Sequence, residues 1–460
     1  MIDRARLSEL IERERLTYKQ RNPRSLAAFH SARHLFGRVP MTWMNKSAGG
    51  FPLYLARAKG AHVEDIDDHD LADFCLGDTG AMAGHSPEAT VKAVQQRYAE
   101  LGGATAMMPT EDSEWVGAEL ARRFGLPYWS FSLTATDANR WAIRLARAVT
   151  GRSKILFNNY CYHGSVDESL IVIGPDGEAM SREGNVGAPG DVTATSRVVE
   201  FNDLDGTERQ LAHGDVAAML MEPALTNIGI VLPVDGYLDG VRELTRKYGT
   251  LLINDETHTF SAGPGGCTKA WHLAPDMLTI GKAIAGGIPT GAYGLSEELA
   301  QKISGRTDLD LIDVGGVGGT LAGNALSVAA MKATLEHVLT DDAFEAMATL
   351  SARFAEGVQA VIDRYELPWS ISRLGARSEY RFSSPPPSNG GESNAVSDPE
   401  LDDFLHVYLA NREVLMTPFH NMALMCPATT QSDVDRHHQA FESAIAELVG
   451  ANPASRPVRS

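Results

Sequence analysis

The sequence predicts an α/β protein in which a large domain holds a mostly parallel sheet between helices, with a smaller α+β domain beside it. Two observations predict this fold class. From about residue 115 to 335, helical segments alternate with short apolar, β-branched runs, a pattern typical of a parallel sheet covered by helices on both faces. After about residue 335 the pattern changes to long helical stretches, which indicates that both ends of the chain build the smaller domain.

The N-terminal part of the chain predicts a helix followed by strands. Residues 4–36 are helical in pattern, with Leu7, Leu10 and Ile11 on one face. Because few large apolar residues line this helix, we favour a solvated arm over an interface helix. Residues 52–76 alternate like strands around a Gly-Ala turn and an Asp-rich turn, and 88–101 is helical again.

The central and C-terminal parts complete the expected elements. Buried strands are expected at KILFNN, AAMLME, TLLIND and MLTIGK, which are residues 154–159, 217–222, 250–255 and 277–282. The polar segment 383–398 predicts a loop within the C-terminal helices. The resulting division is an N-terminal helical arm, a first part of the small domain, the large domain, a second part of the small domain and a disordered tail: 1–37, 38–95, 96–335, 336–450 and 451–460.

Composition bounds the class of protein. A formal net charge of −18 over 460 residues argues against a nucleic-acid-binding or anionic-membrane-binding surface. The sequence holds no apolar run long enough to span a bilayer, and its N-terminus lacks the apolar core of a signal peptide. Its four cysteines are widely spaced, without a metal-type cluster, as in a reduced cytoplasmic protein. We therefore expect a cytoplasmic protein with no metal, no nucleic acid and no membrane partner.

Two polar residues at predicted strand ends point to chemistry. Asp255 ends the run TLLIND, and Lys282 ends MLTIGK before a Gly-rich turn. Ligands of open α/β sheets bind at the carboxyl ends of the strands. A lysine beside an apolar wall loses its proton easily, as a Schiff-base nucleophile must. The structural alternatives are a helix-capping Asp255 and a surface Lys282, and Asp276 stands where a phosphate-binding P-loop would need glycine.

Three further segments could bind an anion or a ring. Thr134, Ala135 and Thr136 precede a helix, whose free N–H groups suit a phosphate, although threonine there is also a common N-cap. Thr320 lies in the Gly-rich loop GGVGGT, which could donate to a phosphate or be a flexible linker. Tyr162, in YHG after a strand, offers an aromatic face, although core packing is the plainer interpretation. No GxGxxG follows a strand, which weakens a dinucleotide interpretation.

In their order and spacing these segments resemble the class III aminotransferases, most closely the glutamate-1-semialdehyde aminomutase-like branch. The resemblance runs from about residue 38 to 445 and rests on the hydroxyl-rich loop, YHG, MEP, the strand ending in DE, GK after a further strand, and GT before GN. It implies fold type I of the pyridoxal-phosphate-dependent transferases, the aspartate aminotransferase-like fold. It also implies pyridoxal 5′-phosphate as cofactor.

The resemblance also implies a role for each site residue. Lys282 corresponds to the Schiff-base lysine and proton shuttle, and Asp255 to the carboxylate that pairs with the pyridine nitrogen. Ala135 and Thr136 correspond to the phosphate cradle. The remaining implied roles are the stacking ring, the residue near the ring hydroxyl and the contact to the neighbouring subunit's phosphate, which fall on Tyr162, Glu222 and Thr320. The last role implies a homodimer with shared active sites.

Departures from the family's pattern bear on the substrate. Trp43 stands where the mutases carry an arginine for a substrate carboxylate, and His420 stands near the position of a mutase carboxylate. His258 could hydrogen-bond the ring oxygen, while Arg377 and Arg381 are possible replacement carboxylate anchors. From these changes we predict a transaminase that moves an amino group from an amine or amino acid to a keto-acid or aldehyde acceptor by a ping-pong mechanism.

Three alternatives remain to this transaminase. An aminomutase of the glutamate-1-semialdehyde type would use the same cofactor without any keto acid. An α/β oxidoreductase would need the dinucleotide fingerprint that the sequence lacks. A catalytically inactive binding protein would have no use for both Lys282 and Asp255.

Overall fold

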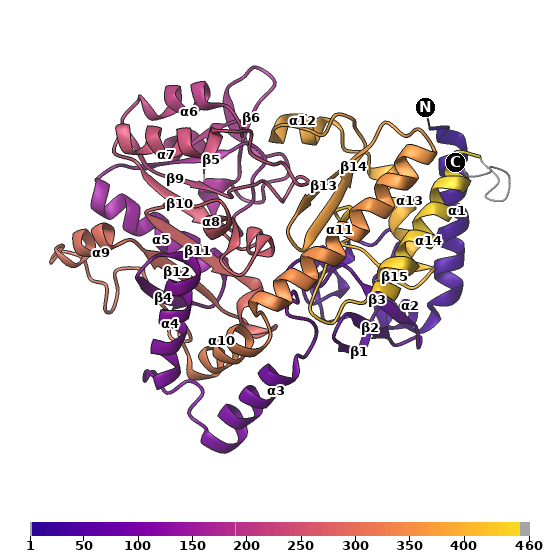
Figure 1. The fold of residues 1–460 in the computed structure, drawn as a ribbon, viewed down its shortest axis with the longest axis horizontal. Helices are drawn as coiled ribbons and strands as arrows, with labels where there is room; N and C mark the ends of the chain where they lie inside the picture. The colour runs from indigo at the N-terminus through magenta and orange to yellow at the C-terminus, as the bar shows by residue number, and fades with distance from the viewer. Residues whose placement is uncertain (1, 189, 451–460) are drawn as a thin grey trace.

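A seven-stranded sheet forms the centre of the larger of two lobes in the computed structural model, which describes residues 2–188 and 190–450 (Figure 1). Its order is β4-β12-β11-β10-β9-β5-β8. The strands are β4 (Tyr128–Ser132), β5 (Lys154–Asn158), β8 (Ser196–Val199), β9 (Val216–Met221), β10 (Leu251–Asp255), β11 (Met277–Gly281) and β12 (Gly291–Leu295). Only β12 among these seven runs antiparallel to its neighbours. This confirms the predicted mostly parallel sheet.

Helices cover both faces of this sheet. Because successive strand residues point to opposite faces, side chains of both sets are buried. Phe157 and Ile253 pack on the face covered by α5, whereas Leu156 and Leu252 pack on the face covered by α7. The helices of this lobe are α4 (Glu111–Phe124), α5 (Ala135–Thr150), α6 (Leu204–Leu211), α7 (Tyr237–Lys247), α8 (Gly266–Ala270), α9 (Glu297–Ser304) and α10 (Ala325–His337). Burial on both faces explains why the strands appear in the sequence as nearly continuous apolar runs.

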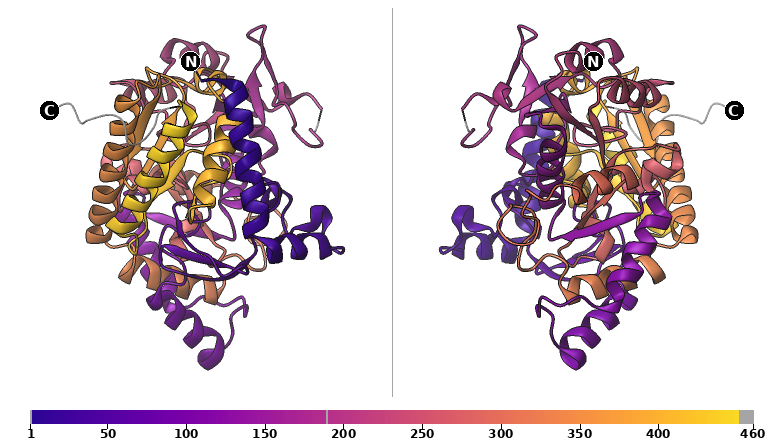
Figure 2. Two further views of the ribbon diagram at one scale, coloured as in Figure 1. Left: turned by 90° about the vertical axis from the view of Figure 1, so that its right-hand side faces the viewer. Right: turned by 90° about the vertical axis from the view of Figure 1, so that its left-hand side faces the viewer.

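The smaller lobe is built from both ends of the chain (Figures 1 and 2). One sheet pairs β1 (Leu55–Lys59), β2 (His62–Asp65), β3 (Asp70–Asp73) and β15 (Val414–Leu415), and a second pairs β13 (Ser370–Leu374), β14 (Arg377–Arg381) and β16 (Met422–Leu424). Its helices include α1 (Arg4–Arg21), α2 (Pro23–Ser31), α11 (Asp341–Arg364), α12 (Gly390–Ala395), α13 (Pro399–Ala410) and α14 (Gln431–Leu448). We propose the domain division expected from the sequence on this arrangement.

Two connecting regions lie outside these sheets and helices. Helix α3 (Glu88–Gln95) continues into a π-helical turn over Gln96–Leu101 and packs against α10. A small hairpin of β6 (Ile171–Ile173) and β7 (Ala179–Ser181) extends from the large lobe. Within the residues that the structure describes, none of the helices combines the length and the apolar character needed to cross a membrane.

Several expectations about the two ends of the chain are wrong. The N-terminal segment is two helices separated at Asn22, and α1 is no solvated arm, because Leu7 and Tyr18 are buried and the helix packs against α13. The segment 383–398 contains the short helix α12 rather than loop alone. Strands β13, β14 and β16 lie where only helices and a loop were expected. The expected disordered tail, 451–460, lies outside the described residues.

Candidate active site

The predicted strand-end residues gather at one edge of the large sheet. Asp255 is the last residue of β10, Glu222 directly follows β9, and Lys282 directly follows β11. Strands β10 and β11 are parallel and neighbouring, with Asp255 opposite Thr279. Lys282 comes three residues after Thr279, the residue opposite Asp255. Because the carboxyl ends of parallel strands meet at the same edge of a sheet, Asp255 and Lys282 both lie at this edge.

Asp255 is a buried carboxylate that three donors hold. Its Oδ2 accepts hydrogen bonds from Nδ1 of His163 and from Nδ2 of Asn139, both at 2.9 Å, and its Oδ1 accepts from the backbone N–H of Thr257 at 3.0 Å. Burial by itself would raise the pKa of Asp255, but these bonds outweigh it and lower the pKa to about 2. The carboxylate is therefore ionised at neutral pH and can pair with a cationic ring nitrogen.

His163 completes a buried ion pair with Asp255. The imidazole is buried, and its Nδ1 faces the carboxylate. Although burial opposes its charge, the neighbouring Cys161 and the hydrogen bond to Asp255 raise the pKa of His163 well above its ordinary value. His163 bonds Oδ2 and Thr257 bonds Oδ1, so both oxygens of the Asp255 carboxylate are held in place.

Lys282 lies in a polar group that we call the lysine cluster: Asp78, Thr79, His258, Lys282 and Arg377. Its Nζ donates to Oδ2 of Asp78 at 2.8 Å, to the backbone oxygen of Asp78 at 3.0 Å and contacts Nε2 of His258 at 2.9 Å. On the other side of the ring, Nδ1 of His258 lies 2.8 Å from the Thr79 hydroxyl and 3.0 Å from Nη2 of Arg377. The cluster joins residues of both lobes around one amine.

Electrostatics differ between the members of the lysine cluster. Burial, with the charge of Lys282, lowers the pKa of His258 well below its ordinary value, so this imidazole is neutral. Burial also lowers the pKa of Arg377, opposed by Asp78, Glu379 and Glu222. Burial opposes the charge of Asp78, but the cationic groups around it, Lys282 and Arg377 among them, outweigh burial and lower the pKa of this carboxylate. The Lys282 amine therefore lies between an ionised carboxylate, Asp78, and a neutral imidazole, His258.

The start of α5 lies against the residue before Lys282. Thr134 is the N-cap, and its hydroxyl oxygen accepts from the backbone N–H of Asp137 at 3.1 Å. A Cβ on Gly281 would lie 2.9 Å from the backbone nitrogen of Ala135, so only glycine permits this approach. The Thr136 hydroxyl accepts from the backbone N–H of Ser165 at 3.2 Å. The helix start, with its free N–H groups, therefore stands beside Lys282 as an anion site.

Buried polar atoms without a partner also converge on this edge. Among the described residues, Oε1 of Glu222, Oγ1 of Thr257, Oδ1 of Asp78 and Nε of Arg377 are buried and make no hydrogen bond. Such atoms are rare in native proteins unless a ligand or water satisfies them. Together with the helix start and the ionised Asp255, they fit the expected pyridoxal phosphate, which has an anionic end, a polar ring and a cationic ring nitrogen.

Three predicted residues lie apart from the lysine cluster within one chain. Tyr162, which follows β5, is partly exposed. Thr320 is exposed on the loop before α10, where a neighbouring subunit could reach it. Nη2 of Arg381 donates to the Ser393 backbone oxygen and to the Ser397 hydroxyl, so this guanidinium holds the region of α12.

The two remaining predicted substrate residues lie in the small lobe. Trp43 is partly exposed and packs edge-on against Phe419, with ring centroids 5.7 Å apart. Nδ1 of His420 lies 3.2 Å from Oε1 of Glu379, and His420 is among the groups that lower the pKa of Asp78. His420 therefore acts on a member of the lysine cluster, whereas Trp43 packs against Phe419.

Sequence reasoning missed Asp78, Thr79 and Asn139. Asp78 and Thr79 follow β3 in the small lobe, and nothing in DFCLGDTGA marks a strand end of the large sheet. Asn139 lies on the buried face of α5, where its amide donates to Asp255. A polar asparagine on the apolar stripe of that helix was the one available signal.

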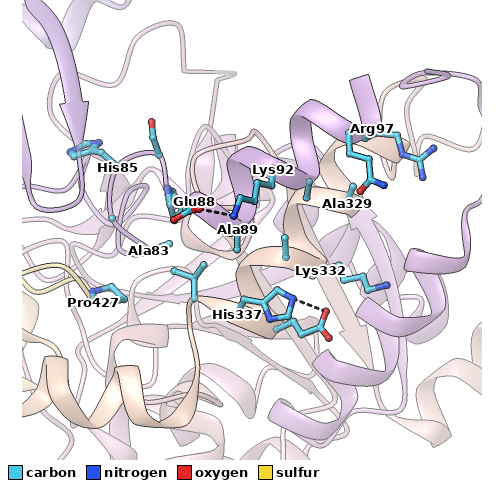
Figure 3. Close-up of a pocket in the computed structure, with 18 of the residues that line it drawn as sticks. Ala83, His85, Glu88, Ala89, Lys92, Arg97, Ala329, Lys332, His337 and Pro427 are labelled. Carbon is cyan, nitrogen blue, oxygen red and sulfur yellow. Dashed lines mark ion pairs between the residues drawn. The ribbon is translucent and has the colours of Figure 1, made fainter. Parts of the chain in front are cut away.

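A separate cavity of about 940 Å³ lies between α3 and α10 (Figure 3). Two of the lysines that line it are paired: Nζ of Lys92 lies 2.6 Å from Glu88, and Nζ of Lys332 lies 2.8 Å from Asp112. No residue of the lysine cluster lines it. The catalytic candidates therefore lie at the sheet edge and not in this cavity.

Comparisons with known proteins agree with this geometry. The family model described as aminotransferase class-III matches residues 43–445. Glutamate-1-semialdehyde 2,1-aminomutase of Chloroflexus aggregans is 32% identical over 417 residues, which cover 88% of this chain and 92% of that protein.

Solved structures extend the similarity to the fold. A glutamate-1-semialdehyde aminomutase from Pseudomonas aeruginosa PAO1, in complex with PMP, is 46% identical with a TM-score of 0.95, covering 97% of this chain and 99% of that one. An omega-transaminase from Sphaerobacter thermophilus is 28% identical with a TM-score of 0.83, covering 93% and 98%.

Proposed function

Since the chain belongs to the class-III aminotransferase family, we propose that it is an aminomutase that moves an amino group between adjacent carbons of a carboxylate-bearing amino aldehyde of the glutamate-1-semialdehyde type. Its cofactor is pyridoxal 5′-phosphate, and its fold is fold type I. From the sequence alone a transaminase was the favoured prediction, with the aminomutase as the alternative. The similarity to proteins named as aminomutases, at 46% and 47% identity for two solved structures, supports the alternative better.

The observation behind this proposal is the position of the Lys282 amine, which contacts Asp78 and His258 at the centre of the lysine cluster. We assign to Lys282 the covalent hold on the cofactor and the transfer of a proton at the amine-bearing carbon of the substrate. Bound pyridoxal phosphate supplies an electron sink for the pair released when that carbon loses its proton. Asp78 and His258, at 2.8 and 2.9 Å, provide the acceptors that position the Lys282 amine.

Asp255 and the start of α5 hold the two ends of the cofactor in this proposal. The ionised Asp255 carboxylate pairs with the pyridine nitrogen and keeps it protonated, and the His163 ion pair keeps the carboxylate in place. Ala135 and Thr136 offer N–H and hydroxyl donors to the phosphate. Tyr162 covers the ring.

Arg377 is the residue that we assign to the substrate carboxylate. Its guanidinium is buried, reaches the lysine cluster through His258 at 3.0 Å, and keeps Nε without a partner. A carboxylate would satisfy that donor and compensate the burial of the charge. We therefore assign to Arg377 the substrate-carboxylate contact for which the mutases use an arginine at the position of Trp43. Arg381 instead donates to the Ser393 backbone oxygen.

A homodimer with shared sites follows from the proposed role of Thr320. The residue is exposed in the single chain, on a loop whose neighbours Ile312 and Val314 are also exposed. Apolar residues exposed together in this way are typical of a surface that a partner covers. The cytoplasmic location stays a prediction.

The deciding experiment supplies glutamate-1-semialdehyde to the purified holoenzyme without any keto acid. An aminomutase converts it over many turnovers to the isomeric amino ketone, and Lys282→Ala abolishes this turnover. Turnover that stops unless pyruvate or 2-oxoglutarate is added in stoichiometric amount would instead identify the transaminase. Borohydride reduction with peptide mapping checks the assignment of Lys282: label on another lysine contradicts it.

A further inference from the structure

Asp78 stands on a loop whose backbone is built around the Lys282 amine. Four consecutive residues, Leu76 to Thr79, have φ values of 44°, 58°, 51° and 81°. Only one of them is glycine, and side-chain-bearing residues rarely adopt this left-handed region, so the conformation costs free energy. Both the carboxylate and the backbone oxygen of Asp78 accept from Nζ of Lys282, at 2.8 and 3.0 Å.

Hydrogen bonds and buried side chains anchor this loop on the small lobe. Oδ1 of Asp73 accepts from the backbone N–H groups of Cys75 and Leu76, at 2.8 and 2.9 Å. The side chains of Leu76 and Met82 are fully buried on either side of Asp78. Asp78 is therefore presented to Lys282 by a rigid frame and not by a mobile side chain that happens to meet it.

His258, the other acceptor near Lys282, is not always available. A neutral imidazole accepts at one ring nitrogen and donates at the other. Arg377 approaches Nδ1 at 3.0 Å and Lys282 approaches Nε2 at 2.9 Å, so His258 cannot accept from both donors at once. An ionised carboxylate accepts only, which makes Asp78 the acceptor that serves Lys282 with either tautomer.

We propose that Asp78 is the counter-ion that keeps the Lys282 nitrogen protonated after that nitrogen is joined to the cofactor. The inference rests on the proposed role of Lys282 as the cofactor lysine. Asp78 acts as a positioning residue, because it acts through Lys282 and not on the substrate. The titratable and charged groups around the pair are His258 from the large lobe and Arg377 and His420 from the small lobe. Three further carboxylates act on these neighbours: Asp255 acts on His258, and Glu379 and Glu222 act on Arg377.

The test is the visible absorption of the holoenzyme as a function of pH. The protonated and deprotonated forms of the lysine–cofactor linkage absorb at different wavelengths, so the midpoint of the change reports the proton on the Lys282 nitrogen. A carboxylate at this distance favours the charged form, so Asp78→Asn should lower the midpoint by about 1–3 pH units. Asp78→Glu should recover part of the shift.

A matched control is available in the same chain. Asp112 pairs with Lys332 at 2.8 Å and with similar exposure, but it lies at the separate cavity beside α10. Asp112→Asn should leave the midpoint unchanged. An Asp78→Asn midpoint equal to that of the wild type, or an equal shift in Asp112→Asn, overturns the inference. Asp78→Ser, with the smaller side chain, gives the same test if the asparagine variant folds poorly.

Failure of this inference can be told apart from failure of the proposed function. Borohydride label on Lys282 together with an unmoved midpoint refutes only the role of Asp78. Label on another lysine refutes both. A shifted midpoint in an enzyme that needs a keto acid supports the counter-ion and refutes the aminomutase.

Discussion

Replacement of Glu222 by glutamine should make the protein more stable at high pH, by an amount that the structure sets. The Glu222 carboxyl is buried after β9, its Oε2 accepts from the Thr226 hydroxyl, and its Oε1 has no partner. Burial raises its pKa from 4.5 to about 7, against the smaller effects of His163 and Thr226. Glutamine keeps the shape of the side chain but cannot ionise.

The sign and size follow from linkage. The folded protein binds a proton at Glu222 more tightly than the unfolded chain does, so this contribution to stability is complete below about pH 4.5 and is lost as the pH rises through 7. A rise from 4.5 to about 7 corresponds to about 3 kcal/mol, at about 1.4 kcal/mol per pKa unit. With an unfolding entropy of about 2.1 cal/mol/K per residue over 460 residues, this is about 3 °C in melting temperature.

The assay is the melting temperature of the cofactor-free protein at pH 5 and pH 8. Glu222→Gln should gain about 3 °C on the wild type between the two pH values. Glu298→Gln serves as control, because Glu298 is an exposed carboxylate paired with Lys302 on the surface. A difference between Glu222→Gln and the wild type that is the same at both pH values would refute the reasoning.

Three further predictions test the other parts of the site. Gly281→Ala should weaken cofactor binding about 10-fold, because its Cβ would press on the start of α5; an unchanged Kd in a fluorescence titration would contradict the phosphate site. Asp255→Asn should lower the unfolding free energy by about 3–5 kcal/mol, because it leaves the buried His163 imidazolium without its counter-ion, and a wild-type denaturation midpoint would speak against the pair. Thr320→Ala and Lys282→Ala should each lose activity as homodimers but recover it in mixed dimers, where one complete site forms; no recovery on mixing would exclude shared sites.

The large lobe was predictable because its strands are buried on both faces. Four apolar runs that end in polar residues marked β5, β9, β10 and β11, and the rule that parallel strands meet at one edge placed Asp255 and Lys282 together. The local pattern and the long-range geometry agree in these segments. The resemblance to the class-III family added the cofactor.

The small lobe was less predictable because its polar faces line the site. Strand β14 reads RSEYR, and its buried Arg377 and Glu379 face other polar groups instead of a hydrophobic core, so no apolar alternation marks it. Asp78 depends on left-handed backbone angles at residues that rarely adopt them, and its contact to Lys282 spans 204 positions in the sequence. Such features arise from tertiary packing, which overrides local preference.

Because β3 pairs with β15, residues from the C-terminal part of the chain complete the frame behind Asp78. Synthesis delivers Asp78, then Asp255 and Lys282, and only much later Arg377 and the strand Val414–Leu415 that pairs with β3. A nascent chain that already holds its lysine thus still lacks the frame that aims Asp78 and the guanidinium that faces it. The Lys282 amine therefore has its full set of neighbours only when β3 and β15, from the two ends of the chain, have paired.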